Sequence, residues 1–306
     1  MVTVSRLALV IVLLWLPHSA RADRVVPPSR IESARGVALG TGVRAAAAST
    51  QAQADNPANL VQGGLYHLEG FTAYDPSSKR ASLGASVVDA MTSRLAAGAS
   101  MRVLLGENDA GKNKGFEGRL SLAVPLADVF SIGVAGRYSN LRVSDTHAVP
   151  ERVPVEGEAS DRSFKLKHFT MDAAATLRPV AGFALSALAY NIIDTHSPLA
   201  PMTVGGSAAF SVGPLTLGGD VLVDLNKQKL FNGPKLLLGG GLEFMASNVA
   251  PLRVGYAYDQ GRKQSFVTGG IGFVDQRAGI QLSLRQSAGG SSHETSLFLG
   301  LQYFVQ

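Results

Sequence analysis

Histidine and serine are the residue types in this chain that could carry nucleophilic or acid–base chemistry. The chain has six histidines and no cysteine. His67 is expected to face inward on the first strand described below, His168 near the outer end of its strand, and His147, His196 and His293 in outer loops. No serine beside them lies in a recognisable nucleophile motif, and no His-Glu-x-x-His spacing offers a metal site. We therefore expect a protein that is not an enzyme and that holds no cofactor and no metal.

Charged residues on one face of the expected strands form a second group with chemistry to offer. Because side chains alternate between the two faces of a strand, the acidic and basic members of this group all point the same way. Their numbers nearly balance, and buried charges persist when they are paired. We favour structural ion pairs that fill a narrow barrel, with the lining of a selective channel as the alternative. The inward-facing candidates are Glu69, Asp172, Asp220, Asp224, Glu243, Asp259, Arg102, Arg119, Arg137, Arg253 and Arg285.

The elements that must position these charges are strands. Between Leu215 and Asn226 the leucines and valines alternate with polar residues, so that Asp220 and Asp224 fall on the face opposite to the apolar one. Such alternation is typical of a strand with one apolar and one polar face. The same pattern predicts strands at about 65–74, 79–89, 94–106, 116–127, 129–142, 164–178, 181–194, 202–212, 215–227, 234–246, 250–260, 264–276, 278–288 and 294–305.

The connections between these strands fall into two classes. Tight connections at 90–93, 125–128, 179–182, 213–214, 247–251 and 275–279 alternate with longer, more polar ones at 107–115, 143–163, 195–201 and 226–233. Short periplasmic turns and longer outer loops are the rule in outer-membrane barrels, whose apolar face meets lipid and whose polar face lines the lumen. The sequence therefore predicts an all-β fold, a transmembrane antiparallel up-and-down β-barrel of about 14 strands.

Aromatic residues and the final strand favour the same fold. Aromatic side chains near the ends of the apolar faces are expected at the membrane interfaces. The last strand carries an apolar face from Leu297 to Val305 and ends one residue before the C-terminus, which resembles the terminal signal that barrel-assembly machinery reads. The candidate interfacial aromatics are Tyr66, Tyr74, Phe183, Phe244, Tyr256, Tyr258 and Tyr303.

The first 22 residues predict export. Arg6 precedes an apolar run from Leu7 to Leu16, and Ala20-Arg21-Ala22 has the small-x-small pattern of a cleavage site. This arrangement is typical of a cleaved signal peptide, because the apolar run is too short to cross a bilayer. The formal charge of +5 is spread along the chain and forms no basic stripe, which does not favour nucleic acid as a partner. We expect the bacterial outer membrane as location and its lipid as partner.

A short motif lies between the signal peptide and the first strand. Small residues from Gly36 to Thr50 are followed by Asn56-Pro57-Ala58. This arrangement resembles the start of the FadL-like family of outer-membrane long-chain fatty acid transporters, a superfamily that also includes PorV-like barrels. The resemblance implies that the N-terminal segment folds into the lumen as a hatch, with Asn56, Pro57 and Ala58 as its anchor. The expected division is 1–22 signal peptide, 23–62 hatch and 63–306 barrel.

Two functions remain open at this point. The first is a FadL-like barrel that moves a small hydrophobic or amphipathic compound across the outer membrane through a hatch-gated lumen. The second is a PorV-like barrel that does not transport and serves as a scaffold or protein partner in an envelope secretion or assembly system. In the long-chain transporters long outer loops build a first hydrophobic capture site, whereas the one long loop here, 143–163, is charged. This difference does not favour a fatty acid as the solute.

Overall fold

A computed structural model describes residues 32–108, 111–144, 163–197, 199–225, 227, 232–289 and 294–305. These residues form fourteen strands. The strands are β1 (Tyr66–Asp75), β2 (Arg80–Asp89), β3 (Ala96–Asn108), β4 (Gly111–Ala127), β5 (Phe130–Ser144), β6 (Ser163–Val180), β7 (Phe183–Tyr190), β8 (Thr203–Val212), β9 (Leu215–Asp224), β10 (Lys235–Ala246), β11 (Ala250–Asp259), β12 (Gln264–Val274), β13 (Ala278–Gly289) and β14 (Thr295–Val305).

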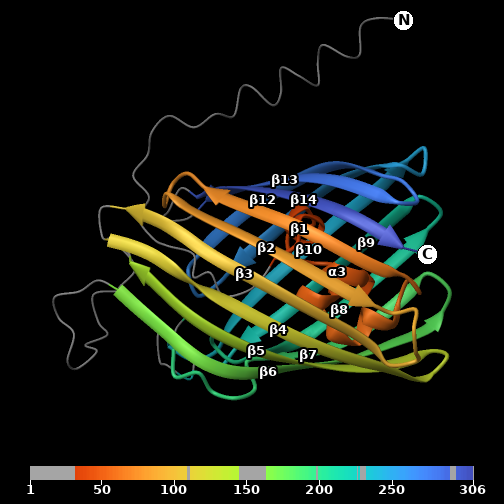
Figure 1. Ribbon diagram of the computed structural model, residues 1–306, viewed down its shortest axis with the longest axis horizontal. Coiled ribbons are helices and arrows are strands. Elements are labelled where there is room, and N and C mark those ends of the chain that lie inside the picture. The colour runs from red at the N-terminus through yellow and green to blue at the C-terminus, as the bar shows by residue number, and fades with distance from the viewer. Residues whose placement is uncertain are drawn as a thin grey trace, which may run out of the picture.

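Every strand pairs antiparallel with its neighbours in sequence, and β1 pairs with β14 to close the sheet into a barrel (Figure 1). The predicted fold class and its strand number are therefore confirmed. Closure leaves no sheet edge, which is what allows a sheet to cross a membrane without unpaired backbone groups. Among the described residues, no helix is long and apolar enough to span a membrane.

Two predicted boundaries are wrong. The strand expected at 181–194 ends at Tyr190, since Asn191 takes a left-handed backbone conformation (φ 54°) and its N–H donates to the Asp172 carboxylate instead of to the neighbouring strand. The outer loop expected at 107–115 is mostly strand, because β3 and β4 continue as a hairpin whose register runs to Asn108 opposite Gly111. The charged residues there had suggested a loop, but they belong to a hairpin that extends the wall.

The outside of the barrel is apolar. Leu83, Leu120 and Val254 are 62%, 69% and 60% exposed, and they represent a large set of leucine, valine, isoleucine and phenylalanine side chains on the outer face. In water such a surface would drive aggregation, whereas lipid tails solvate it. Of the predicted interfacial aromatics, Tyr74 and Tyr303 are 48% and 52% exposed near strand ends. The exterior therefore matches a transmembrane barrel.

Six tight connections lie at one end of the barrel as predicted, whereas the connections at the other end vary in length. At the first end, Asp89 accepts the N–H groups of Met91 and Thr92, and Asp275 accepts those of Arg277 and Ala278. The connection 191–202 lies at the other end. Most residues of the predicted loops 143–163 and 226–233 fall outside the described residues. The predicted signal peptide and the loop histidines His147 and His293 also fall outside them.

Residues 32–62, here called the luminal segment, lie inside the barrel (Figure 1). They form α2 (Ala34–Ala38), the 3₁₀ helix η1 (Arg44–Ala46), α3 (Ser49–Asp55) and the 3₁₀ helix η2 (Pro57–Val61). Ser33 caps α2 by accepting the N–H of Gly36 at 3.0 Å. The four helices contact the inner faces of strands around almost the whole barrel, from β1 through β9 and from β11 to β14. The luminal segment, which includes Asn56, Pro57 and Ala58, is therefore the first place to look for a functional site.

Candidate functional site in the lumen

Asn56 ties the luminal segment to the barrel wall. Its side chain is fully buried and donates to the Arg44 carbonyl at 3.1 Å, to Thr176 Oγ1 at 3.2 Å and to Ser186 Oγ at 3.0 Å. Thr176 and Ser186 face each other on β6 and β7, and their hydroxyls also bond at 2.8 Å. Pro57 opens η2, since proline fits the first turn of a helix, where its missing N–H is not needed. Asn56 thus connects two parts of the segment with two strands.

Asn59 continues this connection and was not singled out from the sequence. Its amide donates to the Arg44 and Ala45 carbonyls at 3.3 and 3.0 Å, and its Oδ1 accepts from Arg178 Nη1 of β6 at 3.2 Å. The motif is therefore better written Asn56-Pro57-Ala58-Asn59, in which both amides satisfy the carbonyls at the start of η1. A second asparagine three residues after the first was the signal in the sequence that could have found it.

Glycines let the segment approach the wall at backbone distance. A Cβ atom on Gly133 of β5 would lie 2.4 Å from the Pro57 carbonyl carbon and 2.5 Å from the Ala58 nitrogen. A Cβ atom on Gly241 of β10 would lie 2.7 Å from Leu39 Cα. No real Cβ atom approaches this closely, so these positions of the wall accept the luminal segment only as glycine. Ala58 is buried in this contact.

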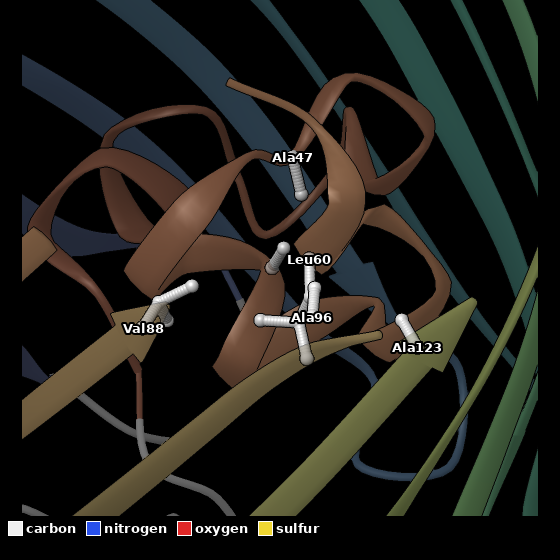
Figure 2. Packing of buried hydrophobic residues seen from close by; sticks show 6 residues of the cluster. Ala47, Leu60, Val88, Ala96 and Ala123 are labelled. Carbon is white, nitrogen blue, oxygen red and sulfur yellow. The ribbon is translucent and has the colours of Figure 1, made fainter. Parts of the chain in front are cut away.

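A small apolar cluster packs the segment against β2, β3 and β4 (Figure 2). Ala47 and Leu60 of the segment contact Val88, Ala96 and Ala123, all at most 2% exposed. Most of the members are alanines, and in a closely packed interior a change of even one methyl group affects stability. Polar and apolar contacts therefore act together on the same four helices.

Ion pairs join the segment to the opposite side of the wall. Arg44 pairs with Asp220 of β9, and Arg285 of β13 pairs with Glu32 at 2.8 Å. Arg35 pairs with Glu243 of β10 at 2.8 Å. The same carboxylate accepts from Arg253 of β11 at 2.5 Å. Predicted inward-facing residues therefore meet basic and acidic groups of the luminal segment, which the sequence interpretation did not include.

A second network lies on β3 to β6, on the long-loop side of the segment. Arg119 pairs with Asp172 at 2.7 Å, while Arg102 and Arg137 lie 3.4 and 3.9 Å from the two oxygens of Glu117. All five are at most 6% exposed. Glu117 was not singled out from the sequence, although it lies two residues before Arg119 on the same strand, so that alternation places both side chains on one face. The two networks support the interpretation of the charges as structural ion pairs.

The remaining predicted charges have separate surroundings. Glu69 is 4% exposed and accepts from Thr50 of the luminal segment, and Asp224 is 7% exposed near the end of β9. Asp259 lies at the end of β11, where it pairs with Arg262 at 2.5 Å. His67 faces inward as predicted and bonds through Nδ1 to Ser49 Oγ at 2.6 Å. In the described part of the chain, no group of three or more His, Cys, Asp or Glu side chains could hold a metal ion.

Asp55 is a buried titratable group at the end of α3 in the luminal segment. Burial raises the pKa of its carboxyl above the ordinary range, against the lowering effects of the nearby Arg44 guanidinium and of a hydrogen bond from Gln51 at 3.3 Å. Its backbone carbonyl accepts from the Tyr190 hydroxyl of β7. The end of α3 therefore carries a buried carboxyl group that, among the described residues, forms no ion pair.

Comparisons with known proteins identify the fold. No family model matches the chain, and no curated protein matches it either. Among solved structures, the Ralstonia pickettii toluene transporter TbuX aligns over 92% of this chain and 100% of its own, with a TM-score of 0.67 and 11% identity. The chain has a FadL-like fold. A Pseudomonas aeruginosa FadL homologue aligns over 92% of this chain and 99% of its own, with a TM-score of 0.59 and 12% identity.

A third structure of the same kind is the Pseudomonas putida toluene transporter TodX. It aligns over 90% of this chain and 98% of its own, with a TM-score of 0.57 and 12% identity. TbuX and TodX are both toluene transporters. At 11–12% identity the likeness concerns the fold, so the solute has to be argued from this chain's own residues.

Proposed function

We propose that this chain is an outer-membrane barrel that moves a small hydrophobic compound from the outside to the periplasm. The observation that carries the proposal is a closed transmembrane barrel with the same fold as two toluene transporters, whose lumen contains its own N-terminal segment. Its apolar exterior supports a place in the outer membrane, with lipid as its surrounding partner. A monoaromatic hydrocarbon is the solute class that the neighbours suggest.

The luminal segment acts as a hatch in this proposal. Its helices contact strands around the lumen at the short-turn end, where Asn56, Pro57 and Ala58 hold them against β5, β6 and β7. The docked segment obstructs the short-turn end of the lumen. The ion pairs of β3 to β6 line the lumen beside it and offer an apolar solute no favourable contacts. Partial undocking of the segment would open a path. The division into a hatch at 23–62 and a barrel at 63–306 belongs to this proposal.

Two measurements test the two parts of the proposal separately. Cells of a Gram-negative host that express the full chain should take up radiolabelled toluene faster than cells with an empty vector; equal uptake would overturn transport. Deletion of residues 36–60 should raise single-channel conductance in planar bilayers, since the segment and its docked helices leave the lumen. Unchanged conductance in a deletion variant that still folds, as judged by heat modifiability on a detergent gel, would overturn the hatch.

A second candidate function is favoured by the filled lumen. The segment, its ion pairs and the network on β3 to β6 leave little open space in the described residues, which suits a PorV-like barrel that serves as a scaffold for an envelope protein. Purification from native membranes discriminates between the two functions. A stoichiometric protein partner together with no toluene uptake would favour the scaffold.

A further inference from the structure

Strands β4, β5 and β6 are longer than a membrane crossing requires. They have 17, 15 and 18 residues, whereas a tilted strand crosses a bilayer in about 9–11 residues. Tight connections join their ends at the short-turn side, so the surplus length projects on the long-loop side. The residues 111–116, 138–142 and 165–169 on that side are here called the outer rim. They lie at the level where the barrel leaves the membrane on its outside.

Aromatic side chains mark the membrane interface within the outer rim. Phe116 of β4, Tyr138 of β5 and Phe169 of β6 lie on the outer face and are 42%, 36% and 50% exposed. The ring centroids of Phe116 and Tyr138 are 5.8 Å apart, and Tyr138 pairs with Phe169 across the strands. Outer-membrane barrels carry such aromatic girdles at both interfaces. The hydrocarbon of the outer leaflet therefore ends close to these three residues.

A row of basic side chains lies next to this girdle, on the side away from the membrane. Lys114 of β4 pairs across the strands with Arg142 of β5, and Arg142 pairs with Lys165 of β6. Both lysines are exposed on the outer face, and Arg142 is half-buried. Two more exposed lysines lie two residues away on the same face of β4 and β6, namely Lys112 and Lys167. Cationic groups therefore gather on three neighbouring strands at the level of the lipid headgroups.

The row places like charges directly opposite each other. Neighbouring strands lie about 4.8 Å apart, so Lys114, Arg142 and Lys165 together span about 10 Å. Like charges in this position destabilise a sheet, and an anion that lies between them replaces the repulsion by attraction. Among the described outward-facing residues of β3 to β6 at this end, the acidic one is Glu107 of β3, which pairs with Lys112 at the margin of the row. The row therefore presents a local excess of positive charge to the outer leaflet.

We propose that the basic row of the outer rim binds the phosphate groups of lipopolysaccharide, the phosphorylated glycolipid of the outer leaflet. Lysine and arginine bind phosphate through charge-assisted hydrogen bonds. The acyl chains of the same lipid lie below, against the aromatic girdle and the apolar surface of the wall. Cations at headgroup level above an apolar wall match an anionic lipid, whereas a soluble phosphate compound matches the cations alone. The site rests on the outer-membrane location in the proposed function and is independent of solute movement.

Native mass spectrometry of the full chain, released from detergent micelles, tests the site with lipid A as the probe. The chain should bind bisphosphorylated lipid A more tightly than dephosphorylated lipid A, by a factor on the order of ten, because the basic row contacts the phosphates. Equal affinity for the two forms would overturn the site. Excess inorganic phosphate should leave the bound lipid A in place, since it lacks acyl chains, and displacement by phosphate would overturn the assignment to a lipid.

Two double variants distinguish the basic row from the net charge of the protein. Lys114→Gln combined with Lys165→Gln should weaken binding of bisphosphorylated lipid A by a factor on the order of 10–30. Arg94→Gln combined with Arg277→Gln is the matched control, since it removes two exposed charges from tight connections at the opposite end. The control should bind like the unaltered chain. Equal affinities of the two double variants would overturn the site, and heat modifiability on a gel verifies that each folds.

The lipid site and the proposed transport fail in different experiments. Phosphate-dependent binding of lipid A together with no toluene uptake by cells would overturn transport and leave the site standing. Toluene uptake together with equal binding of the two forms of lipid A would overturn the site and leave transport standing. If both hold, cells that express the double lysine variant should still take up toluene, because the basic row lies on the outer face of the wall and not in the lumen.

Discussion

At the scale of single residues, the luminal segment is held by a few side chains that each satisfy several buried groups. Asn56 donates to a carbonyl of η1 and to hydroxyls of β6 and β7, while Arg44 and Arg35 reach acids on β9 and β10. Buried polar groups cost most when a partner is removed, because the group that stays behind cannot return to water. Single substitutions here should therefore loosen the segment and leave the barrel intact.

Asn56→Ala should weaken docking of the luminal segment by about 1–3 kcal/mol, since it leaves the Arg44 carbonyl and two hydroxyls without this donor. Hydrogen exchange of the backbone amides from η1 to η2 measures the change. Asn232→Ala, at an exposed position, is the control and should leave exchange as it is. Equal protection in Asn56→Ala and in the unaltered chain would show that Asn56 is not an anchor.

Asp55 predicts a pH dependence of the same docking. The docked state raises the pKa of its carboxyl, chiefly by burial, so the docked state binds the proton more tightly than the undocked one. Its contribution to docking is complete below the ordinary pKa of an aspartate and is lost as pH rises through the raised pKa. Protection of α3 against hydrogen exchange, corrected for the intrinsic rate, should fall as pH rises.

Asp55→Asn supplies the comparison for this pH dependence, because an amide does not titrate. The nearby charges that remain are Arg35, Arg44, Asp220 and Glu32. The variant should show protection that changes little over the same pH range. A slope of protection against pH equal to that of the unaltered chain would assign the titration to another group.

At the scale of elements, the fit between segment and wall depends on where strands lack side chains. β10 has three consecutive glycines, of which Gly239 and Gly241 face the luminal segment and Gly240 faces away. Successive side chains of a strand point to opposite faces, so two successive inward positions of β10 have no side chain. The luminal segment approaches β10 there with the backbone of residues 39–42.

Gly241→Ala should destabilise docking by roughly 1–3 kcal/mol, because its Cβ atom would overlap Leu39 and force α2 away from the wall. Gly240→Ala is a matched control one residue away on the same strand, where a Cβ atom has its nearest neighbour, the Gly218 carbonyl, at 3.4 Å. The rate at which a protease digests the luminal segment in intact barrels measures the loss of docking in the two variants. Similar digestion rates for the two variants would contradict the close approach at Gly241.

At the scale of the whole molecule, the barrel has apolar residues on its outside and charges on its inside. Charge on the outside is tolerated only near the membrane interfaces, because hydrocarbon solvates ions poorly. Leu120 lies near the middle of β4, and Leu126 lies near its short-turn end. Both are exposed, at 69% and 58%.

Leu120→Arg should lower the free energy of unfolding in lipid vesicles by about 2–4 kcal/mol, whereas Leu126→Arg should lower it by about 0–1 kcal/mol. The difference arises because the first arginine lies at the bilayer middle and the second near the headgroups. Urea titration of both variants in the same vesicles measures it. A cost that is no larger at Leu120 than at Leu126 would contradict the placement of β4 across the bilayer.

The amino-acid sequence by itself determined the fold class and the strand number, because alternation with a period of two marks each strand and turn residues separate one strand from the next. The predictions for the end of β7 and for the hairpin of β3 and β4 were wrong. The backbone conformation of Asn191 decides where β7 ends, and the register of β3 and β4 decides how far their hairpin extends. Only the tertiary structure shows which residues contact each other across the lumen. Arg35 meets Glu243 across 208 positions of sequence, and Leu199 meets Leu104. These contacts depend on the closure of the barrel and on the depth of each strand, which no local pattern records.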